Sequence, residues 1–541
     1  MARGSLLALV ALGMGCSGSQ PDVAGGPDAG GTDASSDASA ETTVTADWSL
    51  SLDPGASAGK VNAALLGHYD LSGALFRYDQ VPGLAKVLAP VGFSEWRVGV
   101  GRWEAATLLL PTLTDGTACA AAALPPQAFA TGKTDLQLIT DRDWFTDDGL
   151  PVTEAMTLND GRYSLAYVRS VLDAAAALGA KPYVGIDTMP RALAINRTPS
   201  RTLAAWPEAC NWTWTNAVSN APPADSAVFA AATVGMVKRI VEGSGSEPGR
   251  AASYWEIWNE AELAYAWNPS FDNAMRDKFF QMAIASLIRL DAYRKASSNT
   301  AAKALHFGLG SFAYAITAVG VIRAFDAAPT PQISVDFVSF HSYDNDPMKI
   351  VADIRQVTDA RKKSAHYQNV ELALTEWGPS LVTTVDPTTM DGPLLVSTVI
   401  ALGATAGLDR AHHTFFYDYY AGIPWGLVDH DLKPQPLYHA YELLNAVVAG
   451  GSDRLAPRGF ETGELDAGMG AVLATRDAAG KVRVLVINRG SGARTVQIDL
   501  KGTKPVPTRV LTFDVPGVAA RPSPNSLPVT VPPRAMVLVE L

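Results

Sequence analysis

The stretch SYWEIWNE (253–260) is a short apolar run that ends in two polar side chains, Asn259 and Glu260. Such a run, bounded by loop-forming sequence, is typical of a buried β-strand. Seven more runs of this kind occur between residues 63 and 418, and they are AALLGHY (63–69), EWRVGVG (95–101), KPYVGID (181–187), ALHFGLG (304–310), VDFVSFHSY (335–343), VELALTEW (370–377) and HHTFFYD (412–418). The chain therefore contains eight candidate strands.

Amphipathic helical patterns lie between these runs, including SLAYVRSVLDAAAALGA (164–180), SAVFAAATVGMVKRIVEG (226–243) and DNAMRDKFFQMAIASLIRLDAYRKA (272–296). Alternating strands and helices indicate a parallel sheet. Eight units favour a closed (β/α)₈ TIM barrel over an open doubly wound sheet, and none of the eight runs is followed by a GxGxxG or P-loop motif of the kind that open sheets use to bind phosphate. The fold class predicted is α/β.

The pattern changes after about residue 448. GAVLATRDAAGKVRVLVINRGSGARTVQIDL (470–500) has short apolar runs separated by turn sequences, and the chain closes on SLPVTVPPRAMVLVEL (526–541). Short strands with regular turn signals favour a small β-sandwich. We predict a catalytic barrel over 48–447 and an accessory sandwich over 448–541, to which TADWSLSL (45–52) adds a strand.

The N-terminal segment has the features of an export signal. Residues 1–15, MARGSLLALVALGMG, carry one Arg, an apolar run and small residues before Cys16, as in a secretory signal peptide. Cys16 stands where bacterial lipoproteins carry their lipid, although Gly13 replaces the usual Leu. We expect a lipoprotein at the cell surface or in the periplasm, with plain secretion as the alternative. Residues 16–47 lack Lys and Arg and predict a disordered acidic tether.

The overall charge and the remaining cysteines limit the partners. The net charge is -11 and the pI is about 5.3, which argues against nucleic acid because phosphate binding requires a basic surface. Cys119 and Cys210 could form one disulfide in an oxidising compartment or remain two thiols, and the sequence leaves both readings open. It also leaves the oligomeric state open.

Two glutamates end strands on opposite sides of the predicted barrel. Glu260 ends the fourth run and Glu376 comes next to last in the seventh, and active sites of TIM barrels lie at these carboxyl ends. Paired carboxylates are what glycoside hydrolysis needs, and their separation distinguishes retention from inversion of the anomeric centre. We expect an ionised Glu376 to raise the pKa of Glu260 and to keep it protonated as the acid. The alternative is a buried ion-pair network with Arg97 and Arg102.

Further polar and aromatic residues stand near the same strand ends. We predict substrate-binding roles for Asn259, His341, Tyr343, Arg97 and Trp377. Because neighbouring strand residues face opposite sides, a bulge or strand end is expected at residues 259–260. Glu256 is interpreted as a structural carboxylate of such a buried ion-pair network. His412 and His413 lack a third ligand at metal spacing, so no metal is predicted, and carboxylate chemistry on an acetal requires no cofactor.

Four segments, WEIWNEAEL, KPYVGIDTMPRALA, VDFVSFHSY and ALTEWGPS, resemble the strand-end motifs of the retaining (β/α)₈ glycoside hydrolases of clan A. The nearest resemblance, over about residues 60–541, is to family 39, the family of β-xylosidases and α-L-iduronidases. It implies that Glu260 is the acid/base and Glu376 the nucleophile. It also implies substrate contacts by Asn259, His341 and Tyr343, and a supporting position for Arg97.

The sequence departs from that family at two places. Ala261-Glu262-Leu263 follows the acid/base without the usual Pro, and Thr414 stands where the family has a Trp in its eighth strand. These departures leave the sugar undetermined.

The functional hypothesis is a retaining glycoside hydrolase that cleaves extracellular polysaccharide or oligosaccharide, either β-xylosidase-like or endo-acting. Its partner would be a carbohydrate. The alternative is a catalytically inactive carbohydrate-binding surface lipoprotein.

Overall fold

The computed structural model describes residues 46–69, 81–99, 172, 175–186, 222–223, 225–243, 253–263, 273–327, 333–380, 386, 389–414, 426–429, 432–448 and 452–541. The predicted signal peptide, Cys16, the tether up to residue 45, Arg102 and the two cysteines at 119 and 210 lie outside these ranges.

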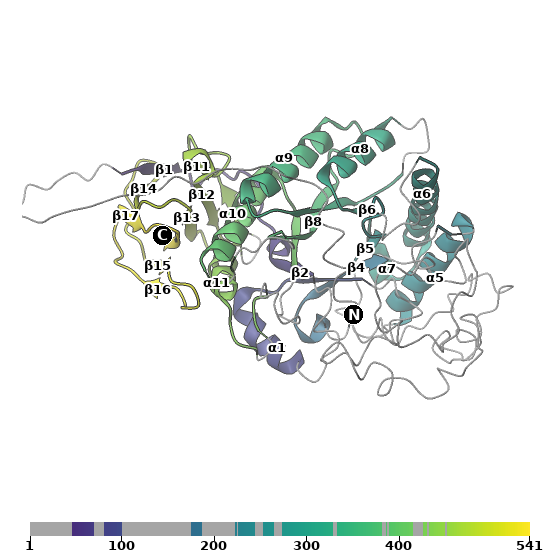
Figure 1. Cartoon of the computed structure of the whole chain (residues 1–541), viewed down its shortest axis with the longest axis horizontal. Helices are drawn as coiled ribbons and strands as arrows, with labels where there is room; N and C mark the ends of the chain where they lie inside the picture. The colour runs from purple at the N-terminus through teal and green to yellow at the C-terminus, as the bar shows by residue number, and fades with distance from the viewer. Residues whose placement is uncertain are drawn as a thin grey trace, which may run out of the picture.

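Eight parallel strands close into a barrel, as the alternation of strands and helices predicts (Figure 1). They are β2 (Gly67–Tyr69), β3 (Glu95–Gly99), β4 (Lys181–Ile186), β5 (Tyr254–Ile257), β6 (His306–Phe312), β7 (Phe337–Tyr343), β8 (Glu371–Gly378) and β9 (Arg410–Thr414). The barrel closes where β9 pairs with β2, with His412 opposite Gly67. Each of the eight predicted runs contributes one strand, although residues 63–66 form a 3₁₀ turn ahead of β2.

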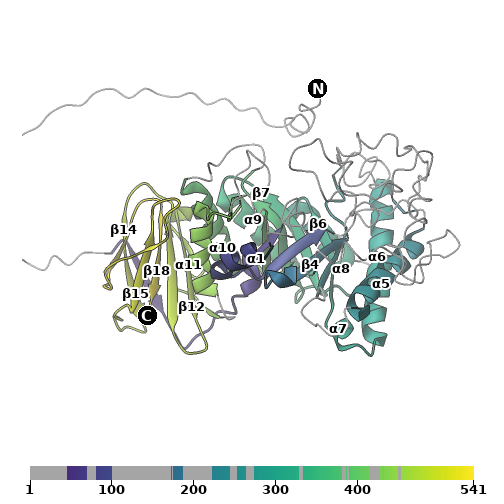
Figure 2. The same ribbon diagram turned by 90° about the horizontal axis from the view of Figure 1, so that it is seen from below.

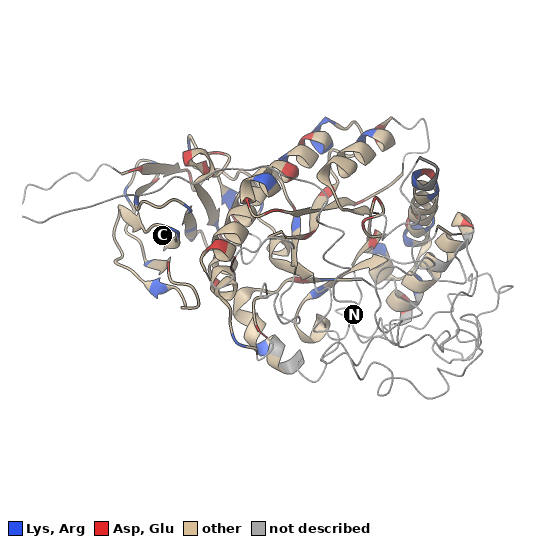
Figure 3. Cartoon of the chain, in the orientation of Figure 1, with Lys and Arg blue, Asp and Glu red and all other residues tan. Residues whose placement is uncertain are grey.

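Helices surround this barrel. Those described are α1 (Val81–Leu88), α5 (Ser226–Gly243), α6 (Asn273–Ala296), α7 (Thr300–Lys303), α8 (Ala315–Asp326), α9 (Pro347–Lys363), α10 (Asp391–Ala406) and α11 (Pro436–Val448). The start of α5 follows from its sequence, because the Asp225 carboxylate accepts the free N–H of Ala227 at 2.7 Å. Acidic and basic residues are interspersed along the outer helices (Figure 3). No helix in the described ranges combines the length and hydropathy of a membrane span.

The C-terminal region forms two packed sheets. One has the order β1-β14-β17, and the other has the order β10-β12-β13-β18-β15-β16, with β11 beside β12. Their bounds are β1 (Trp48–Leu52), β10 (Asp453–Leu455), β11 (Glu464–Leu465), β12 (Gly470–Arg476), β13 (Val482–Asn488), β14 (Arg494–Leu500), β15 (Arg509–Phe513), β16 (Arg521–Pro522), β17 (Val529–Val531) and β18 (Ala535–Glu540). β1 pairs with β14, as expected for residues 45–52, so residues 48–52 of the predicted barrel range lie in the accessory sheets.

The accessory sheets pack against the barrel through α10 and α11 (Figure 2). Leu473 and Leu485 of the second sheet belong to the same buried apolar cluster as Leu444 and Val447 of α11. The Thr475 hydroxyl donates to the Val447 carbonyl at 2.8 Å. The two regions therefore share one continuous core, and the sheets hold two of the barrel's outer helices in place.

The floor of the barrel interior is aromatic. Tyr183, Tyr254 and Phe337 pack with ring centroids 5.4–5.8 Å apart. Gly308 of β6 leaves room for Phe337, because a Cβ at this position would overlap the ring. This floor separates the ion pairs of Arg410 with Glu95 and Glu371, at the amino-terminal ends of the strands, from the polar residues at the barrel mouth.

Candidate active site

The fourth barrel strand ends so that Asn259 and Glu260 both reach the interior. β5 ends at residue 257, and the backbone turns left-handed at Trp258 (φ 77°) and Glu260 (φ 48°). This conformation costs non-glycine residues about 1–2 kcal/mol each. Neighbouring strands hold it, because the N–H of Trp258 donates to a β4 carbonyl at 2.7 Å and that of Glu260 to the Ser311 carbonyl at 2.6 Å. A strand end, one of the two expected irregularities, therefore presents adjacent side chains to one site.

A β-bulge positions Glu376 in β8. Phe340 pairs with Leu374, but His341 pairs with Glu376, so Thr375 is an extra residue in β8. Bulges redirect the side chains that follow them and are frequent beside active sites. The shifted register sets Glu376 directly beside His341.

Arg97 of β3 connects the carboxylates of the site. Its Nη1 donates to Glu376 at 2.8 Å, its Nε to Glu256 at 2.6 Å, and its Nη2 to Asn259 at 2.8 Å and to Ser311 at 2.5 Å. The guanidinium is buried, and burial alone would lower its pKa. The charges of Glu256 and Glu376 outweigh that effect and hold the pKa of Arg97 well above its ordinary value, so it stays charged.

The Glu376 carboxylate is held at both oxygens. Arg97 donates to Oε1, and the Tyr343 hydroxyl donates to Oε2 at 3.0 Å. Burial raises the pKa of Glu376 above 4.5, and the nearby Glu260 raises it further, while His341 and Arg97 act in the opposite direction. Glu376 therefore retains its proton to a higher pH than an exposed glutamate does.

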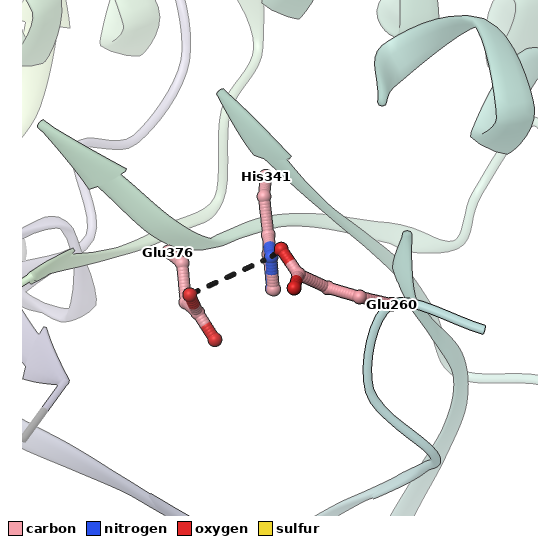
Figure 4. Close-up of side chains that lie close together, drawn as sticks. All are labelled: Glu260, His341 and Glu376. Atoms are coloured by element: carbon pink, nitrogen blue, oxygen red, sulfur yellow. Dashed lines mark hydrogen bonds and ion pairs between the residues drawn. The ribbon is translucent and has the colours of Figure 1, made fainter. Parts of the chain in front are cut away.

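His341 joins the two glutamates. Its Nδ1 lies 2.8 Å from Glu260 Oε1 and 3.7 Å from Glu376 Oε2 (Figure 4). One oxygen of each carboxylate and one ring nitrogen all lie within 4.8 Å of one another. Burial alone lowers the pKa of His341, but Glu376 and Glu260 outweigh it and raise the pKa of the imidazole. The three side chains can therefore exchange a proton over short distances.

Tyr343 and Thr414 complete the side of the site that faces Glu376. Their hydroxyl oxygens lie 2.6 Å apart. Thr414 thus supports the Tyr343 hydroxyl beside Glu376. The loop beyond Thr414 lies outside the described residues.

Trp377 is a correction to the predicted site. Its side chain is fully buried and makes an edge contact with His413, with ring centroids 5.1 Å apart. His413 in turn packs near Tyr441 of helix α11. Because Trp377 follows Glu376 in a strand, it faces the helical layer while Glu376 faces the interior. It belongs to the barrel wall and does not join the other predicted residues.

Several polar residues of the site were not predicted from the sequence. Ser311, Ser339 and Tyr183 all donate to Glu256. Glu262 lies near Glu260, and burial raises its pKa to about 7. The serines and Tyr183 come from strands whose relative register the sequence does not reveal.

The charges of the site disfavour a metal ion between the two glutamates. Carboxylate oxygens and an imidazole nitrogen are suitable ligands for divalent transition metals. However, Arg97 directly contacts Glu376, and its fixed positive charge opposes a second cation at that carboxylate. His412, in the sequence pair without a third ligand, lies 3.3 Å from Glu95 below the site.

No protein-family model and no curated protein matches this sequence. Solved structures do match it. A glucosidase from Croceicoccus marinus shares 17% identity at a TM-score of 0.57, covering 91% of this chain and 98% of its own. A GH39 β-xylosidase from Caulobacter crescentus shares 17% sequence identity at a TM-score of 0.57, covering 91% of this chain and 99% of its own. A GH39 enzyme from Xanthomonas axonopodis pv. citri shares 17% sequence identity at a TM-score of 0.58, covering 92% of this chain and 98% of its own. The chain therefore has the fold of the GH39 glycosidases, barrel and accessory sheets together.

Proposed function

We propose that this protein is a retaining glycoside hydrolase that acts on extracellular polysaccharide or oligosaccharide. The observation that carries the proposal is the approach of one Glu260 oxygen to one Glu376 oxygen within 4.8 Å at the barrel mouth. Carboxyl groups about 5–5.5 Å apart are typical of retaining enzymes, and inverting enzymes need about 6.5–9.5 Å to admit water.

The contacts of each glutamate support a distinct role. Arg97 and Tyr343 orient the Glu376 carboxylate for attack on the anomeric carbon, and their hydrogen bonds favour its ionised form. Glu260, paired with His341, donates its proton to the leaving oxygen as the glycosidic bond breaks. The attack leaves a covalent glycosyl ester on Glu376. Glu260 is then a carboxylate, takes a proton from water, and the resulting hydroxide displaces Glu376 from the sugar.

The names of the solved structures suggest candidate sugars. β-Xylosides and glucosides are the first candidates, because structures with this fold include a β-xylosidase and a glucosidase. Exo-acting and endo-acting hydrolysis are both retained in the proposal. Export with a lipid on Cys16 would place the enzyme at the cell surface or in the periplasm, where it could reach extracellular polysaccharide.

The test is turnover of a panel of aryl glycosides and polysaccharides. Wild type should hydrolyse at least one substrate, with the first-formed sugar retaining its anomeric configuration by ¹H NMR. Glu376→Ala and Glu260→Ala should lose most activity, while Glu442→Ala on outer helix α11 should keep it. Azide should restore Glu376→Gly and give a glycosyl azide of inverted configuration.

Two results would contradict the proposal. Full activity of Glu376→Ala would exclude its role as nucleophile, and an inverted product from wild type would exclude the covalent intermediate. Binding of polysaccharide without any turnover would instead favour the carbohydrate-binding alternative.

A further inference from the structure

Glu256 is a fully buried carboxylate that takes no direct part in the proposed reaction. It lies within β5, four residues before Glu260, and the mechanism above uses neither of its oxygens. A buried charge is expensive unless it is paired and hydrogen-bonded. The contacts of Glu256 therefore indicate what it does.

All side-chain contacts of Glu256 in the described ranges are with donors. Oε1 accepts from Arg97 Nε at 2.6 Å and from the Ser311 hydroxyl at 2.7 Å. Oε2 accepts from the Ser339 hydroxyl at 2.9 Å and from the Tyr183 hydroxyl at 3.1 Å. This set, drawn from strands β3, β4, β6 and β7, fits an ionised carboxylate in one orientation.

The backbone leaves space for this pair. Gly185 lies opposite Glu256 in the register of β4 and β5. A Cβ on Gly185 would lie 3.2 Å from Glu256 Oε1 and 3.6 Å from Arg97 Nη2. A residue without a side chain thus stands where the ion pair occupies the barrel interior.

Arg97 divides its charge between two carboxylates. Its Nη2 lies 2.5 Å from Glu256 and its Nη1 lies 2.8 Å from Glu376. Without Glu256, the whole positive charge of Arg97 would act on Glu376. We propose that Glu256 is a positioning residue that fixes the guanidinium plane of Arg97 and offsets its charge, so that Glu260 keeps its proton beside an ionised Glu376 in the working pH range. This inference rests on the proposed function.

The other charged and titratable groups that face Glu376 and Glu256 in the described part of the chain can be named. Glu376 is faced by Arg97, His341, Glu260 and the Tyr343 hydroxyl. Glu256 is faced by Arg97 and the Tyr183 hydroxyl, with His412 also within its electrostatic influence from β9. Removal of the Glu256 charge therefore adds one uncompensated positive charge to the site, which lowers the pKa values of the Glu260–Glu376–His341 group together.

The experiment is the pH profile of kcat/KM for Glu256→Gln. The acid and the alkaline limb of the profile should both move to lower pH by roughly one pH unit, as expected when one charge is removed at this distance in a protein interior. KM should change little. Glu95→Gln is the matched control, because Glu95 is also a buried carboxylate paired with a buried arginine, Arg410, but at the other end of the barrel. Both limbs of the pH profile of Glu95→Gln should stay at the wild-type pH values.

Tyr183→Phe is a milder variant that keeps the ring packing. It removes one hydroxyl dipole that partly neutralises Glu256, so both limbs should move in the opposite direction, upward by about a few tenths of a pH unit. It preserves the test if Glu256→Gln does not fold.

Unchanged limbs in a folded Glu256→Gln, a shift as large in Glu95→Gln, or a downward shift in Tyr183→Phe would overturn the inference. If wild type turns over no glycoside, the proposed function fails by itself. The charge effect is then read without catalysis, by ¹³C NMR titration of the Glu376 carboxyl group in wild type and Glu256→Gln. That group is identified by loss of its signal in Glu376→Gln, and an unshifted titration would overturn the inference.

Discussion

At the scale of single residues, position along the strand decides which side chains enter the site. Glu260 and Glu376 could be predicted because each is an acidic residue at the end of an apolar strand. Trp377 was assigned to the same site, but alternation turns it toward His413 and the helical layer. Glu256 was interpreted as a structural carboxylate, and it does form an ion pair with Arg97. Its full set of four donors could not be predicted, because they come from strands that pair only in the folded barrel.

The raised pKa of Glu376 predicts the acid limb of the activity profile. Glu376 must be ionised to attack, and burial raises its pKa above 4.5. Activity should therefore be lost on acidification at a pH higher than an exposed glutamate would give. The measurement is kcat/KM from pH 3 to pH 9, and an acid limb below about pH 4 would contradict this prediction.

Glu262 predicts a pH dependence of stability. Burial raises its pKa from 4.5 to about 7, so the folded state holds its proton more strongly than the unfolded chain does. The resulting stability is present below pH 4.5 and is lost as the pH rises through 7. Glu262→Gln removes this loss, so its Tm relative to wild type should rise between pH 4.5 and pH 8. A constant difference in Tm across this range would disprove the assignment.

At the scale of elements, irregular strand ends bring the chemistry together. The left-handed turn after β5 and the extra residue in β8 are what aim Glu260 and Glu376 at one point. The eight strands could be predicted from apolar periodicity, and a strand end or bulge was expected at residue 259. The bulge in β8 could not be predicted, because it depends on pairing with β7 and leaves no pattern in VELALTEW.

Gly308→Ala tests the aromatic floor below the site. A methyl group there would overlap the Phe337 ring, which packs against Tyr183 and Tyr254. Overpacking of this kind costs about 1–3 kcal/mol. Chemical denaturation should show the loss, whereas Gly320→Ala in α8, where a Cβ meets nothing within 4 Å, should show none. Equal stability of the two variants would mean that the floor is loosely packed.

At the scale of the whole molecule, the barrel and the accessory sheets unfold as one unit in this account. α10 and α11 belong to the barrel, yet they bury apolar surface against β12 and β13. The composition predicted a separate accessory region. The sequence also predicted that residues 45–52, from the other end of the chain, add a strand to this region, and β1 does so by pairing with β14. Which strand it would pair with could not be predicted.

Leu485→Ala tests this shared core. The side chain is fully buried in the cluster that also contains Leu444 of α11. Removing it should cost about 2–5 kcal/mol. Calorimetry should show a single transition at lower Tm for the whole protein. Two separate transitions, with only one displaced, would show that the regions unfold independently.

The central claim is that Glu260 and Glu376 hold one sugar between them, with Glu376 as the nucleophile. A 2-deoxy-2-fluoro glycoside of a sugar that the enzyme hydrolyses should arrest the covalent ester, because the fluorine slows its breakdown more than its formation. Peptide mass spectrometry should then find one sugar on the peptide that contains Glu376, and none in Glu376→Gln. A label on another carboxylate, or no label during confirmed turnover, would contradict the account.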